Sequence, residues 1–364
     1  MKLLAQFSRF FVGAVFAFSG FIKLQDPVGT KIKMQEYFHV FAEDLPALAS
    51  LFNWFGEQAI YVSIFMCVLE LVLGIALLLS YKPKATAWIL LAVVIYFGFL
   101  TFYSAYFNKV TDCGCFGDFM HLEPWTSFWK DMVLLFFILI ILWQIKHFKS
   151  TKTGQIMLFT TIGAVLLGIY TNYMQPLFDF RAYAVGKNIP TQMKPSEPLR
   201  FSYTMTKNGE EKIFDKYPTD TTWIYKEMKV LNEEAKPKIT DYALWNDAGD
   251  FTQESFKGEK VYFIVQNLHH YYEKGMPELD LLADSLSKKG KNVAYITSAG
   301  GADFEAFRKE NAITQPFYFG DEKVLKTIAR VNPTIWILNN GIVKGKWSGY
   351  ALPKLNEVEE ALKK

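Results

Sequence analysis

The segment Ala85–Asn108 contains no Asp, Glu, Lys or Arg in 24 consecutive residues. An α-helix of about 20 apolar residues crosses the hydrocarbon core of a bilayer. Two other segments are similar: residues 58–81 carry Glu70 as their single charge, and residues 153–178 carry none. These three segments predict membrane-spanning helices, so the lipid bilayer is the first partner that we expect for the chain.

Two further hydrophobic segments carry a few charges. Leu3–Ile22 contains Arg9, which is followed by 13 uncharged residues, and Thr126–Ile145 contains Lys130 and Asp131 near its start. Both segments can span a membrane when these charged groups reach the headgroup region. No signal-peptide cleavage pattern follows the first segment, so we expect it to be retained as a helix. The sequence thus predicts five spans.

Charge is distributed unevenly along the 364 residues. Charged side chains number 23 in the first 180 residues and 52 in the last 184. The first half is therefore typical of a membrane domain and the second half of a soluble domain. The totals of 39 basic and 36 acidic residues nearly cancel, which argues against nucleic acid as a partner. The three cysteines exclude a disulfide-rich scaffold.

Lysines in the loops predict the orientation of the spans. The loops 81–84 and 146–152 contain five lysines and no acidic residue. The loops 23–57 and 108–125 contain four basic residues in 53. The positive-inside rule places the first two loops and the N-terminus in the cytoplasm. After five spans the C-terminal half lies outside, which in a Gram-negative bacterium means an inner-membrane protein with a periplasmic domain.

Residues 179–238 are polar and interrupted by prolines, and they predict a linker with a small, weakly ordered subdomain. From residue 239 to residue 364, β-type and helical segments alternate. The predicted strands are Val261–Gln266, Asn292–Thr297, Gln315–Phe319, Thr334–Leu338 and Ile342–Trp347. The predicted helices are Pro277–Ser287, Ala302–Glu310, Glu322–Ala329 and Pro353–Leu362.

This order of strands and helices resembles a thioredoxin-like domain. Asn332-Pro333-Thr334 stands where that family carries its cis-proline, and Ile239–Lys260 resembles the lead-in of the TlpA and peroxiredoxin branch. The place of the family's CxxC motif, however, reads Gln266–His270, and no cysteine follows Cys115. Dithiol exchange requires a thiolate, so we expect this domain to dock or bind a partner instead. The adjacent His269 and His270 do not lead us to predict a metal site there.

The sharpest motif in the membrane half is Asp112-Cys113-Gly114-Cys115, followed by Phe116-Gly117-Asp118. It follows the third span, at the predicted outer mouth of the bundle. A disulfide between two cysteines that are two positions apart forms only if the chain bends, and Gly114 allows such a bend. So small a ring should be strained, and a strained disulfide is a stronger oxidant. We therefore interpret Cys113 and Cys115 as a redox-active pair. A static disulfide, or a soft-metal site completed by Asp112 or His121, are the alternatives.

Glu70 lies near the middle of its span, where an isolated carboxylate is costly. It should be protonated, paired or turned to a polar cavity, and Lys23 and Lys130 at the outer helix ends can reach inward. We predict a catalytic set of Asp112, Cys113, Cys115 and Glu70, with Lys23 and Lys130 binding a cofactor, for which a quinone is the candidate. The alternative for Glu70 is a structural hydrogen bond to Ser63 or to a neighbouring helix. Cys67 is interpreted as an apolar filler, and Asp131 with Lys130 as interfacial.

Several sequence motifs in the first 145 residues resemble those of the DoxX and methylamine-utilisation MauE families. The matching features are Ser19–Pro27 (SGFIKLQDP), Glu70 with Gly74, and DCGCFGD ahead of Trp125–Asp131. The resemblance implies a four-helix core in residues 1–150, joined by a fifth helix in residues 151–178. The linker in 179–238 and the thioredoxin-like domain in 239–364 complete an arrangement similar to Bacteroidetes DoxX-family proteins. The fold class is thus an all-α transmembrane bundle followed by a periplasmic α/β domain.

Members of these families resemble quinone-linked or disulfide-assisting membrane proteins, and MauE is tied to the maturation of methylamine dehydrogenase. The leading hypothesis is therefore a membrane redox or protein-maturation factor whose partner is an envelope protein client or a thiol protein. The alternative is a non-enzymatic envelope scaffold with a structural disulfide and a docking domain. A small-solute transporter is disfavoured, because five spans are few and no inverted repeat is visible.

Overall fold

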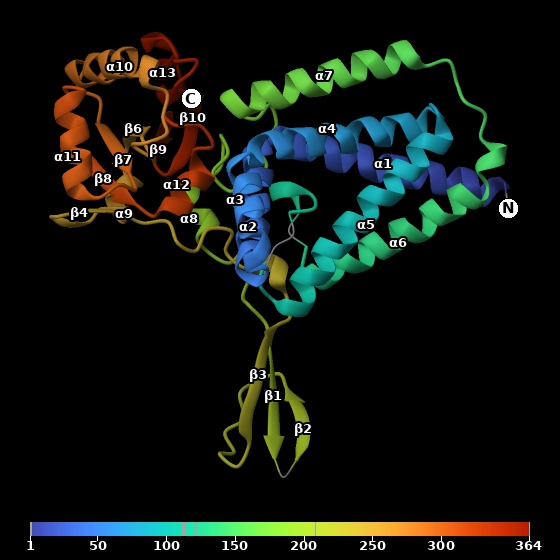
Figure 1. Cartoon of the computed structure of the whole chain (residues 1–364). Coiled ribbons are helices and arrows are strands. Elements are labelled where there is room, and N and C mark those ends of the chain that lie inside the picture. The colour runs from blue at the N-terminus through green and yellow to red at the C-terminus, as the bar shows by residue number, and fades with distance from the viewer. Residues whose placement is uncertain (1, 111–113, 121, 208, 364) are drawn as a thin grey trace. The chain divides into compact units, whose positions relative to one another are not determined.

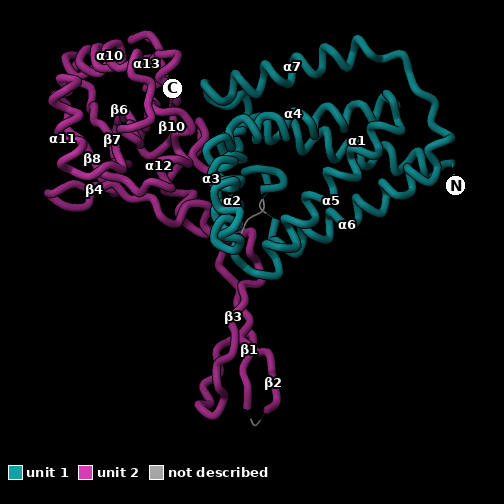
Figure 2. The backbone as a smooth tube through the Cα atoms, in the orientation of Figure 1, with its two compact units in different colours: residues 1–181 teal, residues 182–364 magenta. Residues whose placement is uncertain are grey.

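The computed structural model describes residues 2–110, 114–120, 122–207 and 209–363 (Figure 1). The chain divides into two compact units, residues 1–181 and residues 182–364 (Figure 2). Asp112, Cys113 and His121 lie outside the described residues.

Among the described residues of the first unit, five helices are long and apolar enough to cross a membrane, which confirms the five predicted spans. They are α1 (Lys2–Gln25), α4 (Ala59–Leu78), α5 (Pro83–Phe107), α6 (Pro124–Trp143) and α7 (Gly154–Tyr173). Helix α1 packs along α4 and α6, α5 packs along α6, and α7 lies against α4. A core of buried side chains such as Phe16, Leu77, Leu90 and Ile138 fills the space between α1, α4, α5 and α6.

Two shorter helices, α2 (Pro27–Asp44) and α3 (Ala49–Glu57), occupy the segment that the sequence prediction treated as a loop. The Asp26 side chain caps α2 by accepting a hydrogen bond from the Gly29 N–H at 2.9 Å, and Pro27 begins the helix. A short 3₁₀ turn, η1 (Pro46–Leu48), joins the two. Aromatic contacts such as Phe38 with Phe55 hold α2 against α3.

The segment between α5 and α6, residues 108–123, carries Cys113 and Cys115 and is called the cysteine loop below. It contains the turn η2 (Gly117–Phe119). Gly114 and Gly117 have φ of +62° and +52°, the left-handed region that glycine adopts at low cost. A second turn, η3 (Ile145–His147), follows α6. The two glycines therefore provide the tight bend that the sequence predicted beside Cys115.

The second unit begins with a small antiparallel sheet in the order β2-β1-β3. Its strands are β1 (Phe201–Lys207), β2 (Glu210–Phe214) and β3 (Ile224–Val230), flanked by α8 (Ile189–Gln192) and η4 (Glu233–Ala235). The pairing places Tyr203 beside Phe214 and Met228, and Thr204 beside Ile213 and Glu227. Because cross-strand partners share a face, one face of this sheet is mainly apolar and the other is mixed.

The second unit also contains a seven-stranded sheet in the order β10-β9-β6-β7-β8-β4-β5. Strands β6, β7 and β8 are parallel, whereas β9 and β10 run antiparallel to their neighbours. The strands are β4 (Leu244–Asn246), β5 (Gly249–Asp250), β6 (Glu259–Ile264), β7 (Val293–Thr297), β8 (Phe317–Gly320), β9 (Thr334–Asn339) and β10 (Ile342–Ser348). The helices are α9 (Thr252–Ser255), α10 (Met276–Lys288), α11 (Gly301–Glu310), α12 (Glu322–Ile328) and α13 (Leu355–Lys363), with a short turn η5 (Glu273–Gly275).

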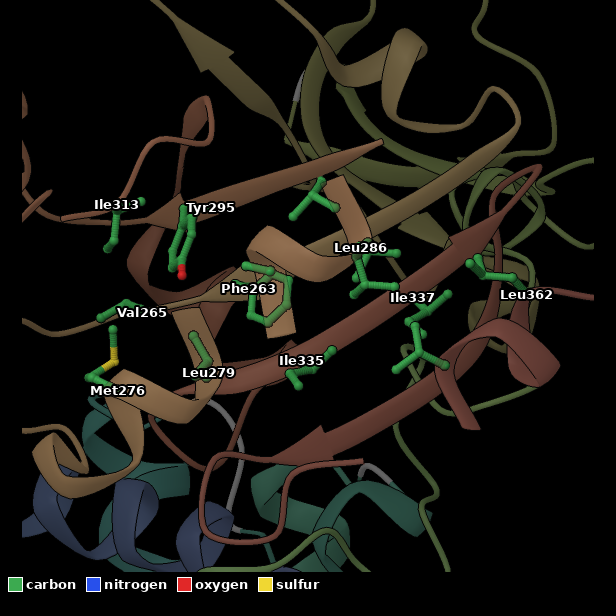
Figure 3. Close-up of a cluster of buried hydrophobic side chains, with 14 of the residues drawn as sticks. Phe263, Val265, Met276, Leu279, Leu286, Tyr295, Ile313, Ile335, Ile337 and Leu362 are labelled. Atoms are coloured by element: carbon green, nitrogen blue, oxygen red, sulfur yellow. The ribbon is translucent and has the colours of Figure 1, made fainter. Parts of the chain in front are cut away.

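This topology confirms the predicted thioredoxin-like fold, and the Asn332–Pro333 peptide bond ahead of β9 is cis. The sheet has a hydrophobic core on each face, and alternate residues of each central strand pack into one core or the other. Phe263 and Ile335 pack with α10, α11 and α13 (Figure 3), while Tyr262 and Trp336 pack with α12 on the other face. Residues upstream of position 239 also contribute to the second core, because Tyr183 and Ile189 are buried in it.

Candidate functional site

A buried ion pair joins two helices of the membrane unit. Lys23 Nζ on α1 lies 2.7 Å from Glu70 Oε1 on α4, and the two side chains are only 8% and 3% exposed. The ammonium also lies 4.7 Å from the centre of the Phe97 ring on α5, a distance typical of a cation–π contact. The structure thus brings together two of the predicted site residues, which are 47 positions apart in the sequence.

Close packing of α1 on α4 makes this ion pair possible. A Cβ atom on Gly20 would lie 2.4 Å from the backbone nitrogen of Leu71, and one on Gly74 would lie 2.3 Å from that of Ala17. Both separations are too short for any residue with a side chain. Small residues at such crossings let membrane helices approach until their backbones touch.

Ser19 connects this ion pair to the cysteine loop. Its Oγ lies 2.8 Å from Glu70 Oε2 and 2.9 Å from the carbonyl oxygen of Cys115. A hydroxyl has a single proton to donate, so it cannot satisfy a carboxylate and a carbonyl fully at once. Ser19 Oγ therefore donates to one of these two acceptors at a time.

A second ion pair lies in the same part of the unit. Lys130 Nζ is 2.9 Å from Asp131 Oδ1, and Thr101 Oγ1 on α5 donates to Asp131 Oδ2 at 3.1 Å. The Asp131 side chain is 1% exposed, whereas that of Lys130 is 25% exposed. Sequence reasoning interpreted this pair as interfacial and missed both the burial of Asp131 and the role of Thr101, which only the packing of α5 on α6 creates.

A small cavity of about 20 Å³ lies between the two ion pairs. Its polar lining combines Ser19, Lys23, Glu70, Cys115, Lys130 and Asp131, and its apolar lining combines Val15, Phe16, Phe97, Phe116 and Leu134. This volume admits about one water molecule. The structure therefore gathers Cys115, Glu70, Lys23 and Lys130 around one space, while Asp112 and Cys113 lie outside the described residues.

Cys115 is buried and lines the same cavity as the Lys23 ammonium. Cys67 is fully buried one turn from Glu70 and lies 3.9 Å from Thr30 Oγ1. Ser63, which was considered as a partner of Glu70, instead donates to the carbonyl of Pro27 at 2.7 Å.

In the C-terminal domain, the segment that replaces CxxC is fixed by Asn332. The Asn332 amide nitrogen donates to the carbonyl of Asn267 at 2.6 Å and to that of His270 at 2.8 Å. Its Oδ1 accepts from the Gln266 N–H at 3.1 Å. His269 and His270 are exposed. Among the residues that the structure describes, no cluster of three or more His, Cys, Asp or Glu is arranged to hold a metal ion.

Comparison with known proteins gives a family match for the membrane half. Residues 1–144 match the family model of the methylamine utilisation protein MauE, which confirms the resemblance expected for the membrane half. The crystal structure of a cysteine-to-serine mutant of PrxQ from Xylella fastidiosa is similar to this chain at 12% identity. That similarity covers 34% of this chain and 85% of the PrxQ chain, with a TM-score of 0.25. No curated protein matches the sequence.

Proposed function

We propose that this protein is a membrane thiol oxidoreductase that serves protein maturation, with Cys113 and Cys115 cycling between dithiol and disulfide. The single observation that carries the proposal is the cavity in which Cys115 meets the Lys23–Glu70 ion pair. This cavity lies in a MauE-like membrane domain, and the chain also carries a thioredoxin-like domain. A fixed loop does not require a charged pair buried beside it, at a considerable desolvation cost.

Oxidation of the two thiols forms one S–S bond and releases two electrons and two protons. Lys23 stabilises a thiolate at Cys115, and Ser19 links the Cys115 loop to the carboxylate of Glu70, which receives a proton. Asp112, adjacent to Cys113 in the sequence, is the candidate base for the other thiol. A membrane quinone, when bound, would accept the two electrons and two protons and leave as quinol.

The fit of a quinone to these residues can be tested on their geometry. Two lysine ammonium groups, Lys23 and Lys130, flank the cavity and are suitable donors to a carbonyl oxygen. A cavity of about 20 Å³ holds a water molecule and not an aromatic ring. The cavity therefore excludes a quinone ring, and a quinone that accepts the electrons would have to bind outside it.

The proposed setting is a bacterial inner membrane with the cysteine loop and the C-terminal domain on the periplasmic side. The lysine-rich loops 81–84 and 146–152 support this orientation. An oxidising compartment suits a cysteine pair that must be reoxidised. The C-terminal domain, which has no cysteine, would hold the client protein close to the membrane site.

Thiol oxidation by the purified full chain in lipid nanodiscs tests the proposal. Dithiothreitol supplies electrons, a decyl-benzoquinone accepts them, and absorbance follows the quinone. We expect the double variant Cys113→Ser/Cys115→Ser to lose quinone reduction while its membrane insertion is unchanged. The matched control is Cys67→Ala, which removes the third cysteine and should keep the activity. Full activity in the double variant would sink the proposal.

A second candidate is a non-enzymatic envelope scaffold in which the cysteine loop is a fixed staple. It is favoured by one observation, the rigid, cysteine-free segment Gln266–His270 that Asn332 holds beside the cis-proline. Thiol trapping in intact membranes discriminates the two. A cysteine pair whose state follows the quinone pool supports the oxidoreductase, and a pair that stays oxidised in mild reductant supports the scaffold.

A further inference from the structure

The segment that follows α7, residues 178–181, packs on the cysteine loop and is called the strap below. The Phe180 ring meets the Phe119 ring edge-on, with 5.1 Å between the ring centres. The backbone N–H of Phe178 donates to the side-chain oxygen of Gln25 at the end of α1, at 3.1 Å. The strap therefore joins the end of α1 to the loop that carries the cysteines, within the membrane unit.

Arg181 is buried at the end of the strap. Its side chain is 2% exposed, and its Nε and Nη2 each donate to the carboxylate of Asp179 at 2.7 Å. Burial alone would lower the pKa of this guanidinium, but the carboxylates of Asp179, Asp26 and Asp118 raise it above its ordinary value. One guanidinium therefore interacts with carboxylates from three segments: the strap, the start of α2 and the cysteine loop.

The two carboxylates outside the strap have defined places in the membrane unit. Asp26 caps α2 through the Gly29 N–H, and Asp118 lies in the turn η2, three positions after Cys115. The family match ends at residue 144, so the cation that they share comes from outside the matched part of the chain. A buried arginine is costly unless it is paired, so these contacts define where the cysteine loop and the start of α2 lie.

The cysteine loop needs support from outside itself. Gly114 and Gly117 lie on either side of Cys115 with φ of +62° and +52°, and glycine leaves a free chain many conformations. Cys115 is nevertheless only 8% exposed. The strap interacts with the loop at Asp118 and Phe119, directly after the second glycine. It therefore limits the conformations that the two glycines would otherwise allow.

We propose that Arg181 is a positioning residue of the thiol site, which holds the cysteine loop through Asp118 and keeps Cys115 beside the cavity. Arg181 acts on the loop and not on the reacting atoms. The inference rests on the proposed function only for the role of Cys115 as a reactive thiol, and the position of the loop is measured without any electron acceptor. Arginine suits this role because its fork binds Asp179 through two N–H groups while its charge also acts on the other carboxylates.

Alkylation of Cys115 tests the proposal. The chain has three cysteines, so Cys67→Ala/Cys113→Ser leaves Cys115 as the single target in the full chain in nanodiscs. In this background Arg181→Gln should raise the rate of reaction with N-ethylmaleimide about tenfold or more, because a loop released from the strap opens more often. Arg181→Lys, which keeps the positive charge, should restore most of the slow reaction.

Arg9→Gln is the matched control. Arg9 donates to Ser80 Oγ and lies about 24 Å along α1 from Gln25, so its loss should leave the rate unchanged. Asp118→Asn should raise the rate as Arg181→Gln does. The two changes combined should have no larger effect than either alone, because both break the same interaction.

Four results would overturn the inference: an unchanged rate in Arg181→Gln, an equal rise in Arg9→Gln, a rise in Arg181→Lys as large as in Arg181→Gln, or rate increases that multiply when Asp118→Asn is added. If Arg181→Gln fails to fold, Asp118→Asn decides alone: a raised rate supports the inference and an unchanged rate overturns it. Failure of the proposed function looks different, because the unaltered chain would then reduce no quinone while the alkylation rates behave as expected. If the unaltered chain reduces quinone and Arg181→Gln reacts at the ordinary rate, only the role of Arg181 is refuted.

Discussion

Removing the negative charge of Glu70 should destabilise the membrane unit through Lys23. In Glu70→Gln the Lys23 ammonium stays buried without its counter-ion, because the bundle closes over it and leaves the side chain 8% exposed. Breaking a buried ion pair by removing one partner costs about 3–5 kcal/mol. The Phe97 ring lies 4.7 Å from the ammonium with or without the carboxylate, so it does not change this difference. We therefore expect Glu70→Gln to lower the free energy of unfolding by about 3–5 kcal/mol.

The double variant Glu70→Gln/Lys23→Met gives the same argument a second test. It removes both charges, and buried ion pairs replaced as a whole by groups of similar volume often cost little. Its loss of stability should therefore be smaller than the sum of the two single losses by about 2 kcal/mol or more. The exposed pair of Glu211 with Lys226 provides the control, because Glu211→Gln should cost less than about 1 kcal/mol.

Unfolding is measured on the full chain in mixed micelles by titration with a denaturing detergent, with tryptophan fluorescence as the signal. The relevant quantity is the coupling free energy from the four corners of the cycle. Strictly additive losses for Glu70→Gln and Lys23→Met would refute the reasoning, because they would mean that the two groups do not depend on each other in the folded state.

Two further predictions concern packing and pH. Gly74→Ala should lower the free energy of unfolding of the membrane unit by about 1–3 kcal/mol, because the added Cβ meets the backbone of Ala17. Gly163→Ala on α7 is the control, since its Cβ meets nothing within 4 Å and should cost little. Unfolding in a denaturing detergent compares the two variants. Burial raises the pKa of Asp280 to about 6, so the folded state loses stability as the pH rises from about 4 to about 6. Asp280→Asn should therefore stabilise the fold by about 1 kcal/mol at pH 8 after screening, measured as a higher Tm, and this gain should vanish towards pH 4.

The membrane spans could be predicted from the sequence because charge is excluded from hydrocarbon whatever the fold. The five predicted hydrophobic segments are therefore helices in the structure, and their ends differ from the predicted ends by a few residues. Five of the seven strands described in the C-terminal sheet were predicted for a similar reason, and β9 begins at Thr334 as expected. The edge strands β4 and β5 were missed, because they are only three and two residues long. Local pattern decides the predicted elements, so tertiary context adds little.

Other features depend on packing between distant segments. Helix α2 was missed because its sequence, Pro27–Asp44, has no clear apolar face and makes its contacts through aromatic rings to α3 and α5. Tyr183 and Ile189 could not be assigned to the core of a sheet that begins about 60 residues later. The site residues show the same limit. Glu70 could be predicted because a charge in the middle of a span is costly, and Lys23 because it lies within reach. The burial of Asp131 was missed, because charged residues near the start of a helix are commonly exposed.

The two ion pairs together explain why a proton should move when a cysteine of the loop reacts. Lys23, Glu70, Lys130 and Asp131 sum to zero charge around a space that holds about one water molecule. Ionisation of Cys115 adds a negative charge to this poorly solvated group, which is costly unless another charge is neutralised. Under the proposed function, protonation of Glu70 would restore neutrality when the thiol of Cys115 loses its proton. Ser19 contacts both Glu70 and the backbone carbonyl of Cys115, so it links this carboxylate to the loop. Among the described residues, Asp131 contacts Thr101 and Lys130 instead, so under the proposed function we expect it to remain the fixed counter-charge.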